Sequence, residues 1–275
     1  MKKLAGKVAL VSGSGRGIGE AIALKLAEEG ASVVVNDLDE VQAVETQTKI
    51  KDLGAQAAVC AGDVTEAGFG EKFVETAMEN FGGLDIIVNN AGYPWDAVIQ
   101  KMSDEQFQAM LDVHTVAPFR ILRAASGPIR EMAKKEKTEG KEVYRKVVNV
   151  SSIAGLYGNA GQMAYAAGKA SMVGMTRTLA KEWGRYNVNV NCVAFGLIET
   201  RMTQALDGEA MMTSIGENEI KMGIRPEMLQ AMSQMIPLGR GGTPEEAAGA
   251  VYLLCSPESN YISGQVLLAS GGLIM

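Results

Sequence analysis

Short apolar segments recur along the chain, separated by longer stretches in which apolar and polar residues mix. The short segments are rich in Val and Ile and apolar throughout, which is typical of strands covered on both faces. The stretches between them have helix length, and alternating strands and helices predict a parallel sheet with right-handed crossovers. The seven predicted strands are Val8–Val11, Ser32–Asn36, Ala57–Ala61, Ile86–Val88, Val147–Val150, Val188–Val193 and Val266–Leu268. We therefore predict an α/β fold, a single doubly wound parallel-sheet domain over residues 1–275 with helices on both faces.

Two segments depart from this alternation. The segment Thr200–Pro237 holds seven of the 16 methionines, a residue overused on surfaces that adapt to apolar partners. It fits either a mobile lid over an apolar substrate, at about 200–237, or ordinary packing between short helices. The segment Arg130–Lys146 holds seven Lys or Arg and four Glu. It fits either a solvated helix extension followed by a loop, or a docking surface for an anionic carrier.

Charge and composition disfavour several classes of partner. With 26 Lys and Arg against 32 Asp and Glu, the net charge of −6 gives no global field that attracts nucleic acid or membranes. No apolar run reaches the roughly 20 residues of a spanning helix, and no signal-peptide pattern opens the chain, so we expect a cytoplasmic protein. No His, Cys or acidic cluster has metal-ligand spacing, so we expect no metal site. Three cysteines far apart in apolar segments are expected to be reduced core residues: Cys60, Cys192 and Cys255.

A glycine-rich turn follows the first predicted strand and opens a helix. Glycines at such a turn let the backbone approach a pyrophosphate, which free N–H groups and the helix dipole then stabilise. A second strand follows and ends at an acid, Asp37, eighteen residues beyond Gly19. This order of features indicates a dinucleotide-binding, Rossmann-type domain. The residues of the turn expected to hold the cofactor are Gly13, Gly15, Arg16, Gly17, Ile18 and Gly19.

Asp37 favours NAD over NADP as the cofactor. A carboxylate at this position accepts hydrogen bonds from the ribose hydroxyls of adenosine and repels a 2′-phosphate. Arg16 opposes this interpretation, because a guanidinium beside the turn can bind that phosphate. We give Asp37 the greater weight, since its exclusion of the phosphate is direct.

Three further side chains predict acid–base chemistry. Tyr165 and Lys169 are four residues apart in a predicted helix and share one face, and Ser152 lies thirteen residues before Tyr165. A neighbouring ammonium lowers the pKa of a phenol from its usual value of about 10. The hydroxyl of Ser152 can then hold a carbonyl oxygen in place. Such a site suits the transfer of a hydride at a C–O carbon.

Together with the turn Asn89-Asn90-Ala91-Gly92, these motifs make the chain resemble the short-chain dehydrogenase/reductase family, from about Lys7 to Gly272. The pattern is closest to the 3-oxoacyl-acyl-carrier-protein reductase branch. The resemblance implies that Tyr165 is the general acid/base, that Lys169 binds the nicotinamide ribose and lowers the tyrosine pKa, and that Ser152 orients the substrate. It also implies a homotetramer, built through the last strand and the tail.

The same resemblance implies further contacts with the cofactor. Asp63 and Val64 match the family's adenine contact, and Ile198 and Thr200 match the positions that hold the nicotinamide carboxamide. Gly196 lies at the family's position beneath the nicotinamide. The turn after the fourth strand is implied to line the cofactor behind the adenosine, through Asn89, Asn90, Ala91 and Gly92.

Two positions depart from the family pattern. His114, the only histidine, stands where the family usually has an Asn that supports a water-linked proton relay to the lysine. It either supports this relay, through its backbone carbonyl or imidazole, or only packs. Because histidine titrates near neutrality, we expect His114→Asn to preserve turnover and to flatten the rate profile between about pH 6 and 8. Phe195 stands where the family commonly has Pro, and its ring either packs against the cofactor or fills space.

These features predict an oxidoreductase that uses NAD, or less readily NADP, to interconvert a secondary alcohol and a ketone in an apolar or acyl-thioester small molecule. The branch that the chain resembles normally uses NADPH, so an NADPH-dependent 3-oxoacyl-thioester reductase is the first alternative. A 3-hydroxyacyl, alicyclic or steroid alcohol dehydrogenase with NAD also fits. A catalytically silent cofactor-binding regulator is the remaining alternative, although Ser152, Tyr165 and Lys169 are all present.

Overall fold

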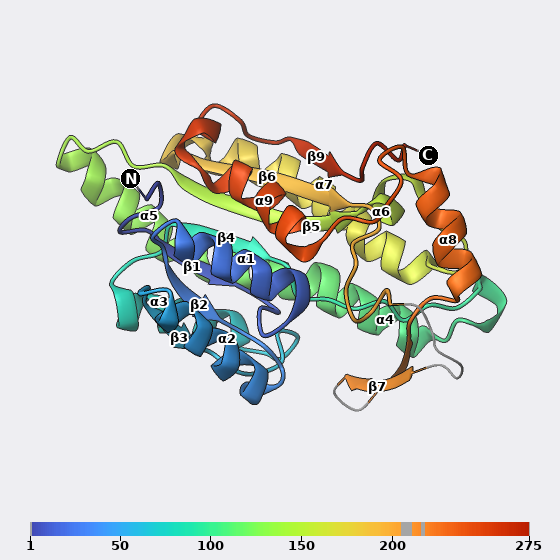
Figure 1. Ribbon diagram of the computed structural model, residues 1–275. Coiled ribbons are helices and arrows are strands. Elements are labelled where there is room, and N and C mark those ends of the chain that lie inside the picture. The colour runs from blue at the N-terminus through green and yellow to red at the C-terminus, as the bar shows by residue number, and fades with distance from the viewer. Residues whose placement is uncertain (1, 205–210, 216–217, 275) are drawn as a thin grey trace.

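The computed structural model describes residues 2–204, 211–215 and 218–274. Its centre is a seven-stranded parallel sheet in the order β3-β2-β1-β4-β5-β6-β9 (Figure 1). The strands are β1 (Val8–Val11), β2 (Ser32–Val35), β3 (Ala57–Val59), β4 (Ile86–Asn89), β5 (Arg145–Ser152), β6 (Val188–Phe195) and β9 (Val266–Ala269). The prediction of these seven strands is confirmed.

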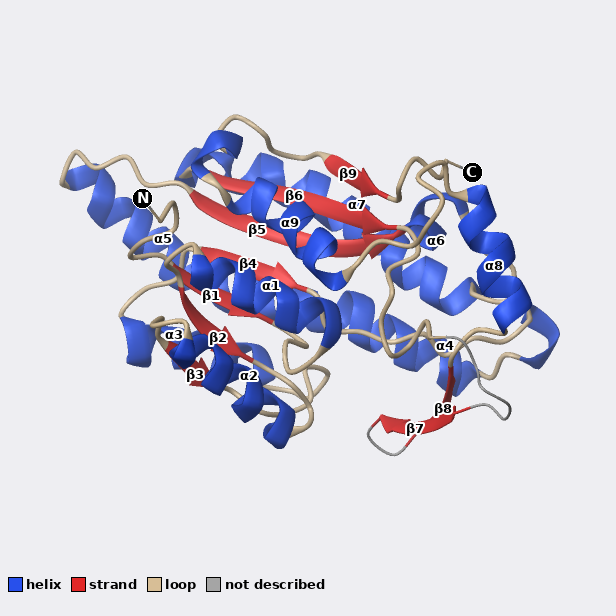
Figure 2. Ribbon diagram, in the orientation of Figure 1, coloured by secondary structure: helices blue, strands red, loops and turns tan. Residues whose placement is uncertain are grey.

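Helices cover both faces of the sheet (Figure 2). The main helices are α1 (Gly17–Glu28), α2 (Glu40–Asp52), α3 (Phe69–Phe81), α4 (Asp104–Leu111), α5 (Ala117–Thr138), α6 (Ile153–Tyr157), α7 (Met163–Trp183), α8 (Pro226–Met235) and α9 (Pro244–Cys255). A π-helical turn, Asp112–Val116, joins α4 to α5. Short 3-10 helices occupy Ile99–Lys101, Gly184–Tyr186 and Pro257–Ser259.

Two apolar clusters form the core, one on each face of the sheet. One packs α1, α2 and α9 against the sheet, and the other packs α3, α4, α5 and α7. Successive residues of β1 point to opposite clusters: Ala9 and Val11 lie in the first, Val8 and Leu10 in the second. This explains why the strands are mostly apolar, since neither face meets water.

The direction in which successive strands are added to the sheet reverses at β1. β1 pairs with β2 on one side and with β4 on the other, so the chain order reverses across it. The connections on the two sides then leave in opposite directions, which opens a crevice at the carboxyl ends of the strands. The glycine-rich turn follows β1 and therefore lies at this crevice.

Two basic residues of the charged segment belong to β5 and are buried. Arg145 and Lys146 are 3% and 4% exposed. Both guanidinium Nη atoms of Arg145 donate to the carboxylate of Glu136. Burial lowers the pKa of Lys146 to about 8. The prediction that this charged segment ends before the strand is wrong, because Arg145 and Lys146 are the first two residues of β5. Lys146 can be buried there because it donates to three neutral oxygens, on Asn189, Ser259 and Asn260.

The remainder of the charged segment lies far from the carboxyl edge. Lys134, Lys135 and Lys137 are exposed near the end of α5. A helix that connects parallel strands runs opposite to them, so this end of α5 lies where β5 begins. Ser152 ends that strand after eight residues, roughly 25 Å away at about 3.3 Å per residue. The structure therefore favours the solvated helix extension over a carrier surface beside the crevice.

The methionine-rich segment contains a hairpin and one helix. The strands β7 (Met211–Ile215) and β8 (Asn218–Met222) pair antiparallel, and the hairpin extends away from the main sheet (Figure 2). α8 packs through Leu229 and Met232 against Ile153. The packing of α8 agrees with the second interpretation in part, whereas the hairpin in the middle of the segment was not predicted. Part of the predicted lid lies outside the described residues: 205–210, 216–217 and the side chains of Met211, Met212 and Met222.

The cysteines are all buried and free, which confirms that they are reduced core residues. No described helix combines the length and the apolar character that crossing a membrane requires. Within residues 2–204, 211–215 and 218–274, no group of three or more His, Cys, Asp or Glu is placed to hold a metal ion.

Replacing Gly19 by Ala tests the packing of α1 at the crevice. A Cβ at Gly19 would lie 1.9 Å from the carbonyl oxygen of Gly13. We expect Gly19→Ala to lower the free energy of unfolding in urea by about 1–3 kcal/mol, because the backbone of α1 must move. The control Gly174→Ala, in α7 with open space around its Cβ, should raise it by about 0.5–1 kcal/mol. A Gly19→Ala protein as stable as wild type would contradict this packing.

Candidate active site

The predicted site residues come together at the carboxyl edge of the sheet. Because the seven strands are parallel, the loop after each strand emerges at this edge. Asp37 follows β2 and Asp63 follows β3. Asn90 follows β4, Ser152 ends β5 and Gly196 follows β6.

The glycine-rich turn forms a cradle at the N-terminus of α1. Gly17 has a φ of +60°, in the left-handed region that L side chains rarely adopt. Arg16 precedes α1 without a side-chain capping hydrogen bond, so its side chain leaves the first N–H groups of the helix unblocked. Gly13 packs on the turn after β4, where an added Cβ would lie 2.7 Å from Cα of Ala91. Ile18 packs against the core and anchors the helix.

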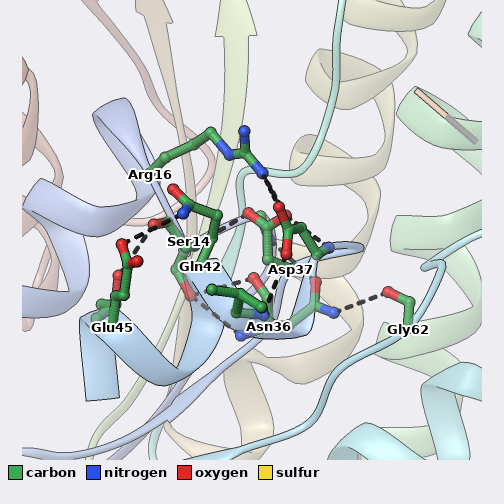
Figure 3. Close-up of polar contacts among 12 residues, drawn as sticks. Ser14, Arg16, Asn36, Asp37, Gln42, Glu45 and Gly62 are labelled. Atoms are coloured by element: carbon green, nitrogen blue, oxygen red, sulfur yellow. Dashed lines mark hydrogen bonds and ion pairs between the residues drawn. The ribbon is translucent and has the colours of Figure 1, made fainter. Parts of the chain in front are cut away.

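Asn36 connects the glycine-rich turn to the loop after β3. Its role in the site was not predicted from the sequence. Its Oδ1 accepts a hydrogen bond from the N–H of Gly13 at 3.0 Å. Its Nδ2 donates to the carbonyls of Cys60 and Gly62, at 3.0 and 3.1 Å (Figure 3). The sequence offered one indication of this role: Asn36 is a polar residue at the end of an apolar strand, and a buried amide needs hydrogen-bond partners.

Asp37 faces the glycine-rich turn (Figure 3). Its Oδ2 accepts from the N–H of Gly15 at 3.1 Å, and its Oδ1 accepts from the N–H of Asp39 at 3.1 Å. Nη2 of Arg16 lies 3.7 Å from Oδ1 of Asp37 and 3.1 Å from Oδ2 of Asp39. Two carboxylates therefore already neutralise Arg16. A Cβ at Gly15 would lie 2.7 Å from Oδ2 of Asp37, so glycine makes room for the acid.

The loop after β3 is fixed by its own contacts. Oδ1 of Asp63 accepts from the N–H and the hydroxyl of Thr65, both at 2.8 Å. Nη1 of Arg120, on α5, donates to the Thr65 carbonyl at 2.6 Å. Val64 is 8% exposed and packs in the second core cluster. An adenine contact by Asp63 and Val64 stays a prediction.

The turn after β4 is tied to the turn after β1. The side-chain amide of Asn90 donates to the carbonyls of Ser12 and Gly13, at 3.0 and 2.9 Å. The backbone N–H groups of Asn90 and Ala91 both donate to the Ser12 hydroxyl. The two turns therefore form one continuous surface, which ends at Gly92.

The segment after β6 is held by a backbone hydrogen bond and by the hydroxyl of Thr203. The N–H of Gly196 donates to the carbonyl of Ala269, at 3.0 Å. The hydroxyl of Thr203 donates to the Ile198 carbonyl at 2.6 Å and accepts from the N–H of Thr200 at 2.8 Å. These contacts order the segment that the resemblance assigns to the carboxamide, and that assignment stays a prediction.

The ring of Phe195 fills space in the core. Phe195 is the last residue of β6 and is 5% exposed. It belongs to the cluster that packs the sheet against α1 and α9, together with Val193 and Ile198. Of the two interpretations that the sequence left open, the structure supports internal packing.

α7 lays Tyr165 and Lys169 along the end of β5. Lys169 is 4% exposed, and its Nζ donates to the Val150 carbonyl at 2.9 Å. The hydroxyl of Ser151 donates to the Lys169 carbonyl at 2.8 Å, which docks the helix on the strand. Nζ of Lys169 lies 5.8 Å from the centre of the Tyr165 ring. Ser152, the last residue of the strand, lies close enough to Tyr165 to lower its pKa, so the three predicted catalytic side chains lie close together.

Burial controls the protonation of Tyr165 and Lys169. Desolvation raises the pKa of Tyr165 to about 12; its hydrogen bond with Ser152 opposes the rise, and the charge of Asp96 adds to it. Desolvation also lowers the pKa of Lys169 to about 8. The prediction that the phenol pKa lies below about 10 is wrong for this structure, because desolvation of the phenolate raises the pKa more than Ser152 lowers it. Tyr165 is therefore a protonated phenol at neutral pH.

Asp96 and Gln162 join the site without having been predicted from the sequence. Nε2 of Gln162 donates to Oδ2 of Asp96 at 2.7 Å, and the N–H of Ala97 donates to the Gly161 carbonyl at 2.9 Å. These contacts tie the loop after β4 to the start of α7, three residues before Tyr165. Burial raises the pKa of the Asp96 carboxyl. The one signal in the sequence was the position of Gln162 shortly before the Tyr-x-x-x-Lys motif.

His114 packs directly against Tyr165, the predicted acid. It is 1% exposed, and its ring meets the Tyr165 ring edge to face, with centroids 5.1 Å apart. Burial, reinforced by the charge of Lys169, holds the pKa of His114 well below the usual 6.5. The prediction that His114 titrates between pH 6 and 8 is therefore wrong, because a desolvated imidazole beside an ammonium stays neutral.

The crevice fits a nicotinamide dinucleotide. The glycine-rich turn presents helix N–H groups without a side-chain cap, which suits a pyrophosphate. Asp37 offers a carboxylate for one ribose, and Lys169 with Tyr165 offers polar groups for the other. The residues of the turns after β1 and β4 would hold the cofactor between these two ends.

Comparisons with known proteins agree with this geometry. Residues 7–210 match the family model described as short chain dehydrogenase, and residues 217–274 match the one described as Enoyl-(Acyl carrier protein) reductase. The chain is 38% identical over 272 residues to the 3-oxoacyl-(acyl-carrier-protein) reductase FabG of Vibrio cholerae, which covers 99% of both proteins. It is 35% identical over 273 residues to the FabG of Thermotoga maritima, covering 99% of this chain and all of the relative.

Similarity of this extent covers the glycine-rich turn and the catalytic residues alike. The protein is accordingly an oxidoreductase that acts on a CH–OH or keto group with NAD(P). The chain belongs to the short-chain dehydrogenase/reductase family.

Proposed function

We propose that the protein reduces the 3-oxo group of acyl thioesters and uses NADH to do so. The observation that carries the proposal is the buried phenol of Tyr165 beside Ser152 and Lys169. With a pKa of about 12, this phenol keeps its proton until a carbonyl oxygen develops negative charge. A protonated phenol in this position can act as the general acid when a ketone is reduced.

Each catalytic side chain has one task in this reaction. When bound, the reduced nicotinamide supplies the hydride that the carbonyl carbon accepts. The hydroxyl of Ser152 orients the carbonyl oxygen, and Tyr165 donates its phenolic proton to that oxygen as the C–O double bond is reduced. Lys169 stabilises the phenolate left on Tyr165, since its ammonium lies beside the ring.

The substrate class is supported by the relatives and by the apolar cover of the site. The relatives named above are reductases of 3-oxoacyl groups on acyl-carrier protein. α8 packs through Leu229 and Met232 on an apolar cluster that includes Ile153, the residue after Ser152, and Met228 and Met235 on the same helix are 59% and 58% exposed. An apolar, adaptable wall of this kind suits an acyl chain.

The preference for NAD is supported by the contacts of Asp37. Its carboxylate lies against the glycine-rich turn, where it would repel a 2′-phosphate. Arg16, the residue that could offset this repulsion, is already paired with Asp37 and Asp39. NADPH, the cofactor that the resemblance implies for the carrier-protein branch, is the alternative. The affinities of Asp37→Ala for NAD and NADP decide between the two cofactors.

We further propose a single domain over residues 1–275, with a lid at about 200–237, that assembles as a cytoplasmic homotetramer without nucleic-acid or membrane partners. The net charge of −6 supports the exclusion of polyanionic partners. Exposed apolar side chains flank the last strand, at Tyr261, Ile262 and Ile274, and support an interface there.

Removing the phenolic hydroxyl tests the proposed acid. We expect Tyr165→Phe to lower kcat for acetoacetyl-pantetheine reduction by about 10²–10⁴-fold, because the variant has no proton to donate. The rate is followed as loss of NADH absorbance. Tyr186→Phe is the matched control, since Tyr186 packs in the core near α5 rather than at the crevice. Equal rates for wild type and Tyr165→Phe would contradict the proposal, and inactivity of both would support a silent regulator.

Replacing the acid after β2 tests the choice of cofactor. We expect Asp37→Ala to raise the affinity for NADP relative to NAD by about tenfold, because removing the carboxylate ends its repulsion of the 2′-phosphate and leaves Arg16 paired with Asp39 alone. The two dissociation constants are measured by fluorescence titration. Asp39→Ala, which removes a carboxylate paired with Arg16 but leaves Asp37 in place, is the control. An unchanged ratio in Asp37→Ala would contradict the role of Asp37.

A further inference from the structure

Thr46 is a polar residue on the buried face of α2. The buried residues of this helix are Ala43, Thr46 and Ile50, whose spacing places them on one side of it. Ala43 and Ile50 are apolar and belong to the first core cluster. Thr46 is 0% exposed, so its hydroxyl needs a hydrogen-bond partner inside the protein.

The partner of this hydroxyl lies outside the helix. A threonine within a helix can donate to the carbonyl four residues before it, as Thr48 of the same helix does to Val44 at 2.9 Å. Thr46 instead donates to the carbonyl of Gly15 at 3.1 Å. The hydroxyl therefore ties the middle of α2 to the glycine-rich turn.

Gly15 is held from two sides. Its carbonyl accepts from Thr46, and its N–H donates to Oδ2 of Asp37, the acid labelled in Figure 3, at 3.1 Å. Glycine has a wide range of backbone conformations, so Gly15 depends on such contacts to keep this one. The fit against Asp37 is close, since an added Cβ at Gly15 would lie 2.7 Å from Oδ2. Any rotation of Gly15 would therefore change the position of the carboxylate.

We propose that Thr46 is a positioning residue for the choice of cofactor. Its hydroxyl fixes Gly15, and Gly15 fixes the carboxylate of Asp37 where it binds the ribose hydroxyls and repels a 2′-phosphate. The inference rests on the preference for NAD proposed above. Because Thr46 is fully buried, it acts on the cofactor only through these two residues.

Replacing Thr46 by Val removes the hydroxyl and nearly keeps the shape of the side chain. We expect Thr46→Val to lower the dissociation constant for NADP divided by that for NAD about three- to fivefold, because Gly15 loses a buried hydrogen bond and Asp37 its fixed position. The shift is smaller than in Asp37→Ala, since the carboxylate is still present. Both constants are measured by fluorescence titration of the full-length protein.

Three further variants separate positioning from packing. Thr46→Ser keeps the hydroxyl and should restore the wild-type ratio. Thr48→Val makes the same change on the exposed side of α2 and should leave the ratio unchanged. Thr46→Ala removes the same hydroxyl and replaces the Val variant if that protein does not fold. A purely structural role predicts that loss of the hydroxyl weakens NAD and NADP equally, and that result would overturn the inference.

The contact between Gly15 and Asp37 can also be observed without cofactor. We expect Thr46→Val to speed hydrogen exchange of the Gly15 amide by about threefold or more in 1H–15N spectra, because the backbone opens more readily at this residue. Thr48→Val should leave this rate unchanged. An unchanged rate in Thr46→Val would overturn the inference whichever cofactor the enzyme prefers.

A double-mutant cycle tests the route through Asp37. In the Asp37→Ala background, Thr46→Val should change the ratio by less than about twofold, because no carboxylate remains to be positioned. A shift as large as in the wild-type background would overturn the proposed route. If Asp37→Ala shifts the ratio and loss of the Thr46 hydroxyl does not, the inference fails while the preference for NAD stands. If Asp37→Ala leaves the ratio unchanged, both are contradicted.

Discussion

All seven strands of the main sheet run in the same direction, and this constraint decides where chemistry can occur. Parallel strands send every following loop to one edge, so residues separated by more than a hundred positions meet there. The glycine-rich turn, the acid Asp37 and the catalytic serine each come from a different strand of this edge. The opposite edge carries the buried Lys146, which donates hydrogen bonds to three neutral oxygens.

Buried hydrogen bonds fix the catalytic helix at this edge. Asn149 of β5 donates to the hydroxyl of Thr176 on α7 at 2.8 Å, and it accepts from Asn89 of β4 at 2.8 Å. The contacts of Lys169 with the Val150 carbonyl and of its own carbonyl with Ser151 continue this network. Because buried polar groups are costly when unpaired, the network favours this position of α7 along β5. That position sets the distance between phenol, hydroxyl and ammonium.

The sequence predicts those parts of the protein that follow from local pattern. Val- and Ile-rich runs predicted all seven strands, because strands buried on both faces are mostly apolar. The glycine spacing and the Tyr-x-x-x-Lys motif located the turn and the helix face. The burial of Arg145 could not be predicted, since its partner Glu136 belongs to another element. The π-helical turn around His114 and the hairpin β7–β8 also lack a local signature.

Protonation states depend still more on the three-dimensional surroundings. From the sequence, Lys169 was expected to lower the pKa of Tyr165, and His114 was expected to titrate near neutrality. Desolvation reverses both expectations, and the resulting protonated phenol and neutral imidazole support a site that donates a proton during reduction. Paired side chains such as Asp96 and Gln162 add to this environment from loops that carry no motif.

The central claim is that hydride passes from the nicotinamide to the keto carbon while Tyr165 supplies the proton. It is tested most directly by incubating the enzyme with acetoacetyl-pantetheine and NADH deuterated at the transferring position of the nicotinamide ring, and by analysing the product by mass spectrometry and NMR. The account predicts one deuterium on the new carbinol carbon and none on the hydroxyl, which exchanges with solvent. A product without deuterium at that carbon would contradict it.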